Sequence, residues 1–249
     1  MWRWRDSGHQ RWRLARSLMS TLIIVVGLFV GLPSICDADS RTGSVSDING
    51  TVRLDRNGQT STPVLTASVF LNDRYTTEPA SSLAIALAGG ASIEEGESSS
   101  IVIDQNLLNA SSTLQSTQIG LLNGILHSVV AHLTSSQSFT VRTENAICGV
   151  RGTDFTVTFS HGYARPGYGG CGDYTDVSVS SGTVTVANLQ NPSVTVVVNE
   201  GYATTVPCLH APLTPGPVGL AAAGVPTAPA AAPPPPICPP CAVFGGHMH

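Results

Sequence analysis

The chain contains no lysine, so all twelve of its basic residues are arginine. Charged residues make up 11% of the 249 positions, well below the roughly 25% that is typical of a soluble domain. Residues 39–249 contain seven arginines and fourteen acidic residues, a net charge of −7. Binding to a phosphate backbone requires clustered Lys or Arg, so this charge balance predicts no nucleic-acid partner.

The sequence also lacks the motifs of common enzymes, including Gly-x-Ser-x-Gly, a phosphate-binding loop and His-Glu-x-x-His. Glu94, Glu95 and Glu97 surround a glycine without the spacing of a calcium loop, and we interpret them as a solvated turn. The spacing of His127 and His132 brings them to one face of neither a strand nor a helix, which argues against a metal pair. We therefore expect no enzymatic activity, no cofactor and no metal in this part of the chain.

Residues 1–38 have the pattern of an export signal. A basic segment with five arginines precedes an uncharged apolar stretch and then small residues that end at Ala38. Cleavage before Asp39 would release the protein into the periplasm or the medium. Alternatively, the apolar stretch stays uncleaved and anchors the protein in the inner membrane with its domain in the periplasm.

Residues 41–206 read as one all-β domain. Apolar residues alternate with polar ones in several short runs, and this period of two is typical of half-buried strands. Glycine and Asn-Pro turns separate the runs, which suggests a β-roll, a solenoid-like fold or a sandwich of short strands. One stretch, 122–133, fits both a helix and a buried strand, and periodicity alone does not decide between them.

Residues 207–249 hold twelve of the seventeen prolines and nine alanines. Such a segment cannot bury enough apolar area to fold alone, and we expect a disordered, extended tail. It ends in Cys238-Pro-Pro-Cys241 and in His247-Met-His249, a set that could hold a soft metal such as zinc or copper. A disulfide or an unpaired end is the alternative interpretation.

The most distinctive segment is Val150-Arg151-Gly152-Thr153-Asp154-Phe155. It resembles the Val-Arg-Gly-Thr-x-Phe core of the FecR domain family. Weaker matches follow in the same order along residues 41–206, including the step around Asp73, the strand pair around Gly182 and the closing step at Gly201. The resemblance implies an envelope protein, and the best-understood members relay the state of an outer-membrane siderophore receptor to a sigma factor.

Two departures from that family separate this chain from its full regulators. Only about 17 residues precede the apolar stretch, too few to form the cytoplasmic anti-sigma domain that such regulators carry. The Pro/Ala segment stands where they have a receptor-docking domain. The resemblance therefore implies the fold and the compartment more than control of a sigma factor.

Physical chemistry assigns the Arg-Gly-Thr core to a structural corner, formed by Arg151, Gly152, Thr153, Asp154 and Phe155. Gly152 permits a backbone conformation that a side chain forbids, and Phe155 begins the next run of alternating core residues. Arg151 would lay its guanidinium across backbone carbonyls or a carboxylate such as Asp154 or Asp176. A ligand contact at this core is the alternative.

The glycine-rich loop 160–172 carries four residues suited to contact a partner, which are His161, Tyr163, Arg165 and Tyr168. A plain hairpin loop is the alternative. In an exported protein the cysteines should be oxidised. Hairpin register leaves open whether Cys148 pairs with Cys171 or with Cys208.

These observations favour an exported, non-enzymatic FecR-like module that binds an envelope protein or ligand through the loop 160–172 or through a sheet edge. A membrane-anchored signal transducer is the first alternative. A metal or thiol redox protein that acts through its tail is the second.

Overall fold

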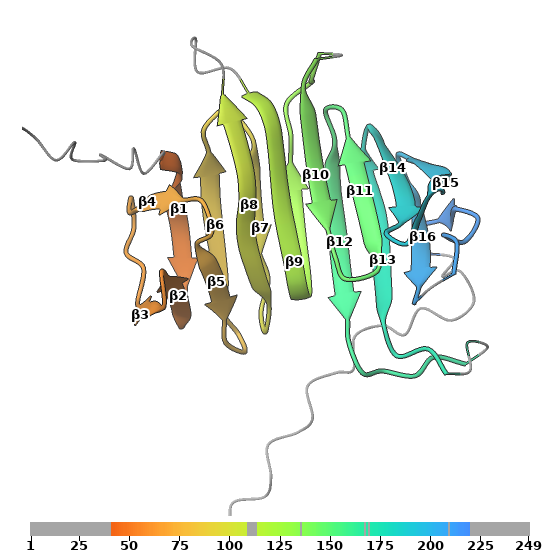
Figure 1. The fold of residues 1–249 in the computed structure, drawn as a ribbon, viewed down its shortest axis with the longest axis horizontal. Coiled ribbons are helices and arrows are strands. Elements are labelled where there is room, and N and C mark those ends of the chain that lie inside the picture. The colour runs from red at the N-terminus through yellow and green to blue at the C-terminus, as the bar shows by residue number, and fades with distance from the viewer. Residues whose placement is uncertain are drawn as a thin grey trace, which may run out of the picture. The chain divides into compact units, whose positions relative to one another are not determined.

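The computed structural model describes residues 41–108, 114–134, 136–166, 168, 170–208 and 210–219, all of which lie in the compact unit Ser40–His249. These residues contain seventeen strands and no helix, which confirms the predicted all-β class. The strands run up and down while the chain advances steadily from β1 to β16, as Figure 1 shows. The ambiguous stretch is a strand over residues 122–129, which belong to β9 (Leu114–Val129), and residues 130–133 are neither strand nor helix.

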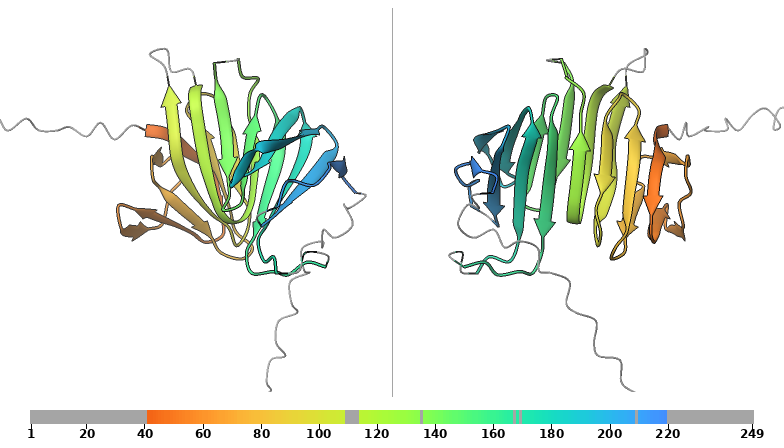
Figure 2. Two further views of the ribbon diagram at one scale, coloured as in Figure 1. Left: turned by 45° about the vertical axis from the view of Figure 1, so that its right-hand side comes forward. Right: turned by 180° about the vertical axis from the view of Figure 1, so that it is seen from behind.

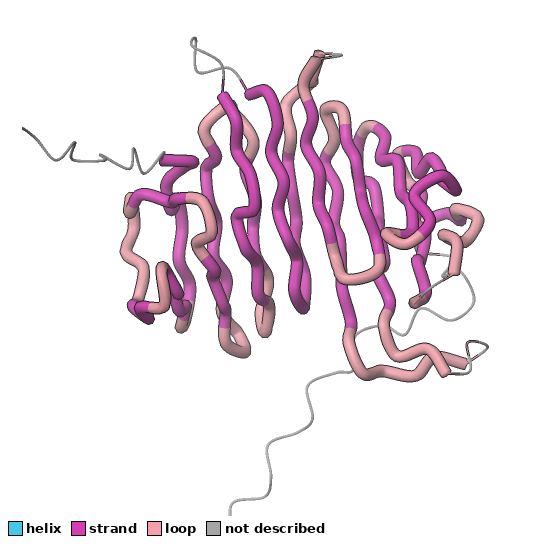
Figure 3. The backbone as a smooth tube through the Cα atoms, viewed as in Figure 1, coloured by secondary structure: helices cyan, strands magenta, loops and turns pink. Residues whose placement is uncertain are grey.

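Hydrogen-bonded pairing divides the strands into two sheets, which Figure 2 shows from two sides and Figure 3 shows as a continuous backbone tube. Sheet A has the order β4 (Ser68–Phe70), β1 (Arg41–Asn49), β6 (Ser82–Leu87), β7 (Ser92–Glu95), the C-terminal part of β9, β12 (Asp154–Ser160), β13 (Tyr174–Ser181), β16 (Tyr202–Pro207) and β17 (Gly216–Pro217). Sheet B has the order β3 (Gln59–Ser61), β2 (Val52–Arg56), β5 (Arg74–Thr77), β8 (Ser100–Leu108), the N-terminal part of β9, β10 (Ser138–Arg142), β11 (Ala146–Val150), β14 (Thr183–Asn188) and β15 (Asn191–Asn199).

The long strand β9 joins the two sheets. Its first part pairs with β8 and β10, and its last part pairs with β7 and β12. The partners change at Gly124, where φ is +88° and a Cβ would collide with Ser99. Only glycine reaches this conformation readily, so Gly124 allows one strand to pass from one sheet into the other.

The core lies between the sheets and follows directly from the alternation in the sequence. Phe155, Val157 and Phe159 of β12 are buried, while the residues between them are half-buried. Phe139 of β10 meets Phe155 across the two sheets, with ring centroids 6.5 Å apart in an edge-to-face arrangement. Aromatic pairs of this geometry add to the free energy gained from burial alone.

The folded unit continues past residue 206. β17 pairs with β16 in sheet A, and the backbone N–H of Leu213 donates to the carbonyl of Thr205. The first residues of the segment expected to form a tail therefore pack on the domain. The tail residues Cys238, Cys241, His247 and His249, like the predicted signal segment 1–38, lie outside the described residues.

Candidate functional site

The Val-Arg-Gly-Thr-Asp-Phe segment is the corner where the chain crosses from β11 in sheet B to β12 in sheet A. Gly152 has a φ of +77°, and a Cβ at this position would lie 2.6 Å from the Cα of His132. Thr153 exchanges two backbone hydrogen bonds with Val130, and its Oγ1 donates to the carbonyl of Thr183. The corner is thus fixed by its backbone geometry and its close packing.

Arg151 does not make the contacts with Asp154 or Asp176 that the sequence analysis suggested. Asp154 lies 2.8 Å from His127, and Asp176 accepts two hydrogen bonds from Arg165, so neither carboxylate is bound to Arg151. Arg151 itself is exposed and makes no hydrogen bond or ion pair with any other described residue.

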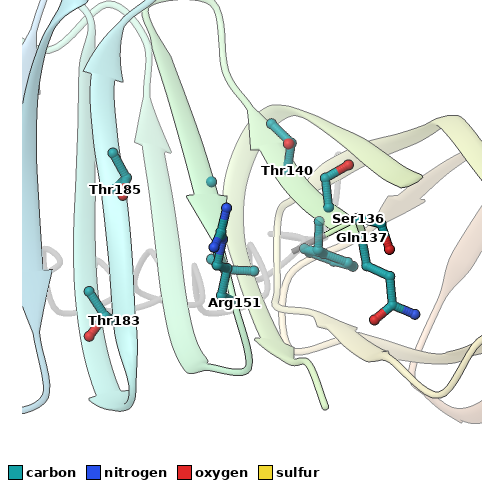
Figure 4. A pocket seen from close by; sticks show the side chains of 10 residues that line it. Ser136, Gln137, Thr140, Arg151, Thr183 and Thr185 are labelled. Atoms are coloured by element: carbon teal, nitrogen blue, oxygen red, sulfur yellow. The ribbon is translucent and has the colours of Figure 1, made fainter. Parts of the chain in front are cut away.

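Arg151 instead stands in a shallow hollow beside β10, β11 and β14 (Figure 4). Gly149 lies opposite Thr140 on one side and Thr185 on the other, so no side chain fills the space between these two threonines. Hydroxyl and amide groups line the same hollow, from Ser136, Gln137, Thr140, Thr183 and Thr185. A guanidinium among hydroxyl groups is suited to bind a carboxylate or another small anion.

The four residues of the β12–β13 loop that were predicted to contact a partner differ in their exposure to solvent. His161 and Tyr163 are exposed, and Tyr163 leaves 65% of its surface in contact with solvent. Arg165 is 9% exposed, where the sequence suggested an exposed side chain. Tyr168 packs edge-on against Tyr174, with ring centroids 6.0 Å apart.

Arg165 fixes the loop to sheet A. Its Nη1 and Nη2 donate to the two carboxylate oxygens of Asp176 at 2.9 and 2.6 Å. Its guanidinium also lies 4.3 Å from the centroid of the Tyr174 ring, a cation–π contact. A bidentate, largely buried pair of this kind sets the orientation of the loop and leaves Tyr163 and His161 to face solvent.

A disulfide bond joins Cys171 at the end of this loop to Cys208 after β16. The two Cα atoms are 5.7 Å apart, and the pairing of Tyr174 with Pro207 in sheet A brings them together. Cys148 therefore forms neither of the two disulfides considered from the sequence. It is a free thiol buried in the core, where desolvation raises its pKa to about 12. Burial therefore keeps Cys148 protonated and unreactive.

Comparison with known families identifies the domain. The model of the family described as FecR protein matches residues 73–185, a range that includes the corner, the hollow and the loop. Residues 73–185 form a FecR domain. This family is regulatory rather than catalytic, and it suggests a signalling or sensor role.

Two crystal structures of a candidate anti-sigma factor from Parabacteroides distasonis ATCC 8503 are similar to this chain, each with 16% sequence identity and a TM-score of 0.44. Each alignment covers 58% of this chain and 59% of that chain. The search of curated proteins found no match. Within the described residues of the FecR domain and its extension to Gly219, no helix is long and apolar enough to cross a membrane.

Glu95 of the FecR domain is buried, so the prediction that it belongs to a solvated turn is wrong. It ends β7 with its side chain in the core, 0% exposed, and its oxygens have no hydrogen-bond partner among the described residues. Desolvation raises its pKa to about 8. The sequence did hold a signal, because Ile93 and Glu95 share one face of a strand with period two.

Arg56 is a second residue that the sequence analysis did not single out. Its guanidinium binds both carboxylate oxygens of Asp73 at 2.6 Å and lies 4.5 Å from the centroid of the Phe70 ring. Asp73 belongs to the step of the sequence that resembles the FecR family, and it is 0% exposed. The pairing of β2 with β5, which places Asp55 opposite Arg74, brings the two residues together.

Proposed function

We propose that this chain is an exported FecR-domain module that binds a protein partner in the cell envelope and acts in signalling or sensing without catalysing a reaction. The single observation that carries the proposal is the anchored β12–β13 loop. Arg165, Tyr168 and the Cys171–Cys208 disulfide hold its base and its return arm, while Tyr163 stays 65% exposed.

An exposed tyrosine on a fixed backbone suits recognition, because little conformational entropy is lost when a partner covers it. The disulfide supports export, since such bonds persist in oxidising compartments. The open edge of sheet B offers a second contact surface. β15 is the last strand of sheet B, paired with β14, and Val194 and Val197 of β15 are 43% and 53% exposed.

Photo-crosslinking in living cells of the source organism tests the role of the loop. A photoreactive phenylalanine analogue replaces Tyr163, Tyr202 of β16 or Val197 of β15, all of which are exposed. We expect one discrete crosslinked protein from position 163 and none from position 202. A crosslink from position 197 alone would mean that the partner binds at the sheet edge. Equal crosslinking from all three positions would contradict a specific binding site.

Cell fractionation and intact mass test export and distinguish the alternative. A mass that begins at Asp39, in soluble periplasm or medium, is the expected result. A mass that begins at Met1, in the inner membrane, would instead favour the membrane-anchored transducer. A change of mass on thiol labelling with and without reductant checks that Cys171 and Cys208 are oxidised in the exported protein.

A further inference from the structure

Three potential metal ligands meet at one end of the domain. Glu144 lies in the turn between β10 and β11 of sheet B, and His161 and Asp173 flank the mouth of the β12–β13 loop of sheet A. The last pair in that hairpin is Ser160 with Tyr174, so His161 and Asp173 occupy the next opposed position. Neighbours across two antiparallel strands have side chains close together.

Strand periodicity directs these side chains toward sheet B. Phe159 and Thr175 are an opposed pair that faces the core, and His161 and Asp173 lie two residues farther along the same face. They therefore stand just beyond the core, at the open end between the two sheets, where Glu144 approaches from the other side. His161 Nδ1 is 2.8 Å from Asp173 Oδ1 and 3.9 Å from Glu144 Oε2.

Buried hydrogen bonds fix the turn that carries Glu144. The flanking residues Thr143 and Asn145 are 6% and 5% exposed, and the Oγ1 of Thr143 is 2.7 Å from that of Thr175 in β13. Asn145 accepts a hydrogen bond from Thr175 and donates one to the carbonyl of Val206 at 2.8 Å. Glu144 is the exposed residue between two buried ones, so its side chain extends outward from a rigid turn.

The backbone of Asp173 is fixed in the same way. Its carbonyl accepts hydrogen bonds from the backbone N–H of Cys208 at 2.8 Å and from the Nδ2 of Asn145 at 3.2 Å. The disulfide holds Cys208 beside it. Asn145 therefore links the turn that carries Glu144 directly to the backbone of Asp173. The backbone positions of these two ligands are thus set before any ion binds.

We propose that Glu144, His161 and Asp173 form a binding site for a divalent transition-metal ion of the zinc class. The three candidate ligand atoms lie within 4.8 Å of one another. Ligands about 2.0–2.2 Å from a tetrahedral zinc ion are roughly 3.3–3.6 Å apart, a spacing that small rotations of these side chains reach. An imidazole among the ligands favours such an ion over calcium or magnesium, which prefer oxygen alone.

Three protein ligands leave a coordination position open to water or to a group from a partner. A bound ion would also connect the β12–β13 loop to the β10–β11 turn, across the two sheets. The site does not depend on the proposed partner-binding role, because its ligands and their support are all internal to the domain.

His127 provides a matched control within the same chain. It too lies between two carboxylates, with Asp154 2.8 Å from its Nε2 and Glu94 4.0 Å from its Nδ1. The two acids face opposite nitrogens of the ring, so one ion cannot contact all three groups. At His161 both carboxylates face Nδ1, and the ligands converge.

Isothermal titration of the metal-free, oxidised full chain with zinc chloride at pH 7.5 tests the site. The chain carries Cys238→Ser, Cys241→Ser, His247→Ala and His249→Ala, which remove competing ligands from the tail. We expect one zinc ion per chain, and an affinity at least about tenfold lower in each of His161→Ala, Asp173→Asn and Glu144→Gln. His127→Ala should bind zinc as the parent does.

Nuclear magnetic resonance of the imidazole rings locates the ion independently, since zinc should shift the His161 signals and leave those of His127 in place. Thermal unfolding without metal checks that Glu144→Gln, at an exposed turn position, folds as the parent does. The proposal is overturned by an absence of zinc binding in the parent, by binding that survives all three substitutions, or by an equal loss in His127→Ala.

Discussion

The two ends of the domain each contain an arginine bound to an aspartate through two hydrogen bonds, but the burial of the partners is reversed. Near β2, the aspartate Asp73 is 0% exposed, while the side chain of Arg56 is 32% exposed. Near β13, the side chain of Arg165 is 7% exposed and that of Asp176 is 20% exposed. Each arginine also stacks on an aromatic ring, Phe70 at one end and Tyr174 at the other.

From this comparison we expect that the more buried member of each pair determines how much stability is lost when its partner is removed. Removing one member of a buried pair leaves the other charge without compensation, and this costs more when the remaining charge is fully buried. A remaining charge that still contacts water regains part of its hydration. The two pairs should therefore respond in opposite ways to loss of the arginine and loss of the aspartate.

The largest effect is expected from Arg56→Met, which leaves the buried Asp73 carboxylate with only the Phe70 N–H and the Tyr75 hydroxyl as donors. We expect the free energy of unfolding to fall by about 3–5 kcal/mol, measured by urea denaturation at pH 7. Asp73→Asn should cost less, because Arg56 reaches solvent. A larger loss for Asp73→Asn than for Arg56→Met would break the comparison at this end.

The reverse order is expected at the second pair. Asp176→Asn leaves the Arg165 guanidinium buried and unpaired, and we expect a loss of about 2–4 kcal/mol. Arg165→Met should cost less, since Asp176 is partly exposed and keeps the hydrogen bond from Thr205 Oγ1 at 2.6 Å. The same denaturation assay decides the order, and equal losses at both positions would remove the predicted asymmetry.

Glu95 extends the comparison to a buried carboxyl group that has no hydrogen-bond partner among the described residues. Its pKa is raised to about 8 by burial, so the folded protein holds a proton that the unfolded chain releases near pH 4.5. The contribution of Glu95 to the free energy of unfolding is therefore greatest below about pH 4.5. It falls as the pH rises to 8, by up to about 1.4 kcal/mol per pH unit.

Glu95→Gln should abolish this dependence, because the amide does not titrate. Urea denaturation of the parent and the variant at intervals from pH 5 to pH 9 measures it, and the difference between the two free energies should grow with pH up to about 8. A difference that stays constant over this range would show that Glu95 is ionised, or hydrated, in the folded protein.

Much of the fold follows from the sequence, because alternation of apolar residues is a local signal. The strands around Phe155, Val184 and Val196 were visible as runs of period two, and the turn at Gly152 followed from a conformation that only glycine adopts readily. β9 was ambiguous because its apolar residues change sides as it passes between sheets, which mimics a helical spacing.

The sequence predicted the burial of charged residues less well, because burial depends on which strands pair across the fold. Arg165 lies in a glycine-rich loop with every local sign of exposure, and only the approach of Asp176 and Tyr174 from β13 makes it an internal anchor. Both disulfides considered from the sequence, Cys148 with Cys171 or with Cys208, are wrong, because the pairing of β13 with β16 brings Cys171 to Cys208 instead. The three ligands of the proposed metal site come from two hairpins in different sheets.

The smallest effect is expected from Arg53→Met, which removes the third arginine–carboxylate pair. Arg53 Nη2 is 3.3 Å from Glu78 Oε1, and the two side chains are 51% and 45% exposed. Water solvates the charge that remains after its partner is removed, so we expect a loss of less than about 1 kcal/mol in urea denaturation, and less still in high salt. A cost equal to that of Arg56→Met would mean that the number of ion-pair contacts, and not burial, controls stability in this domain.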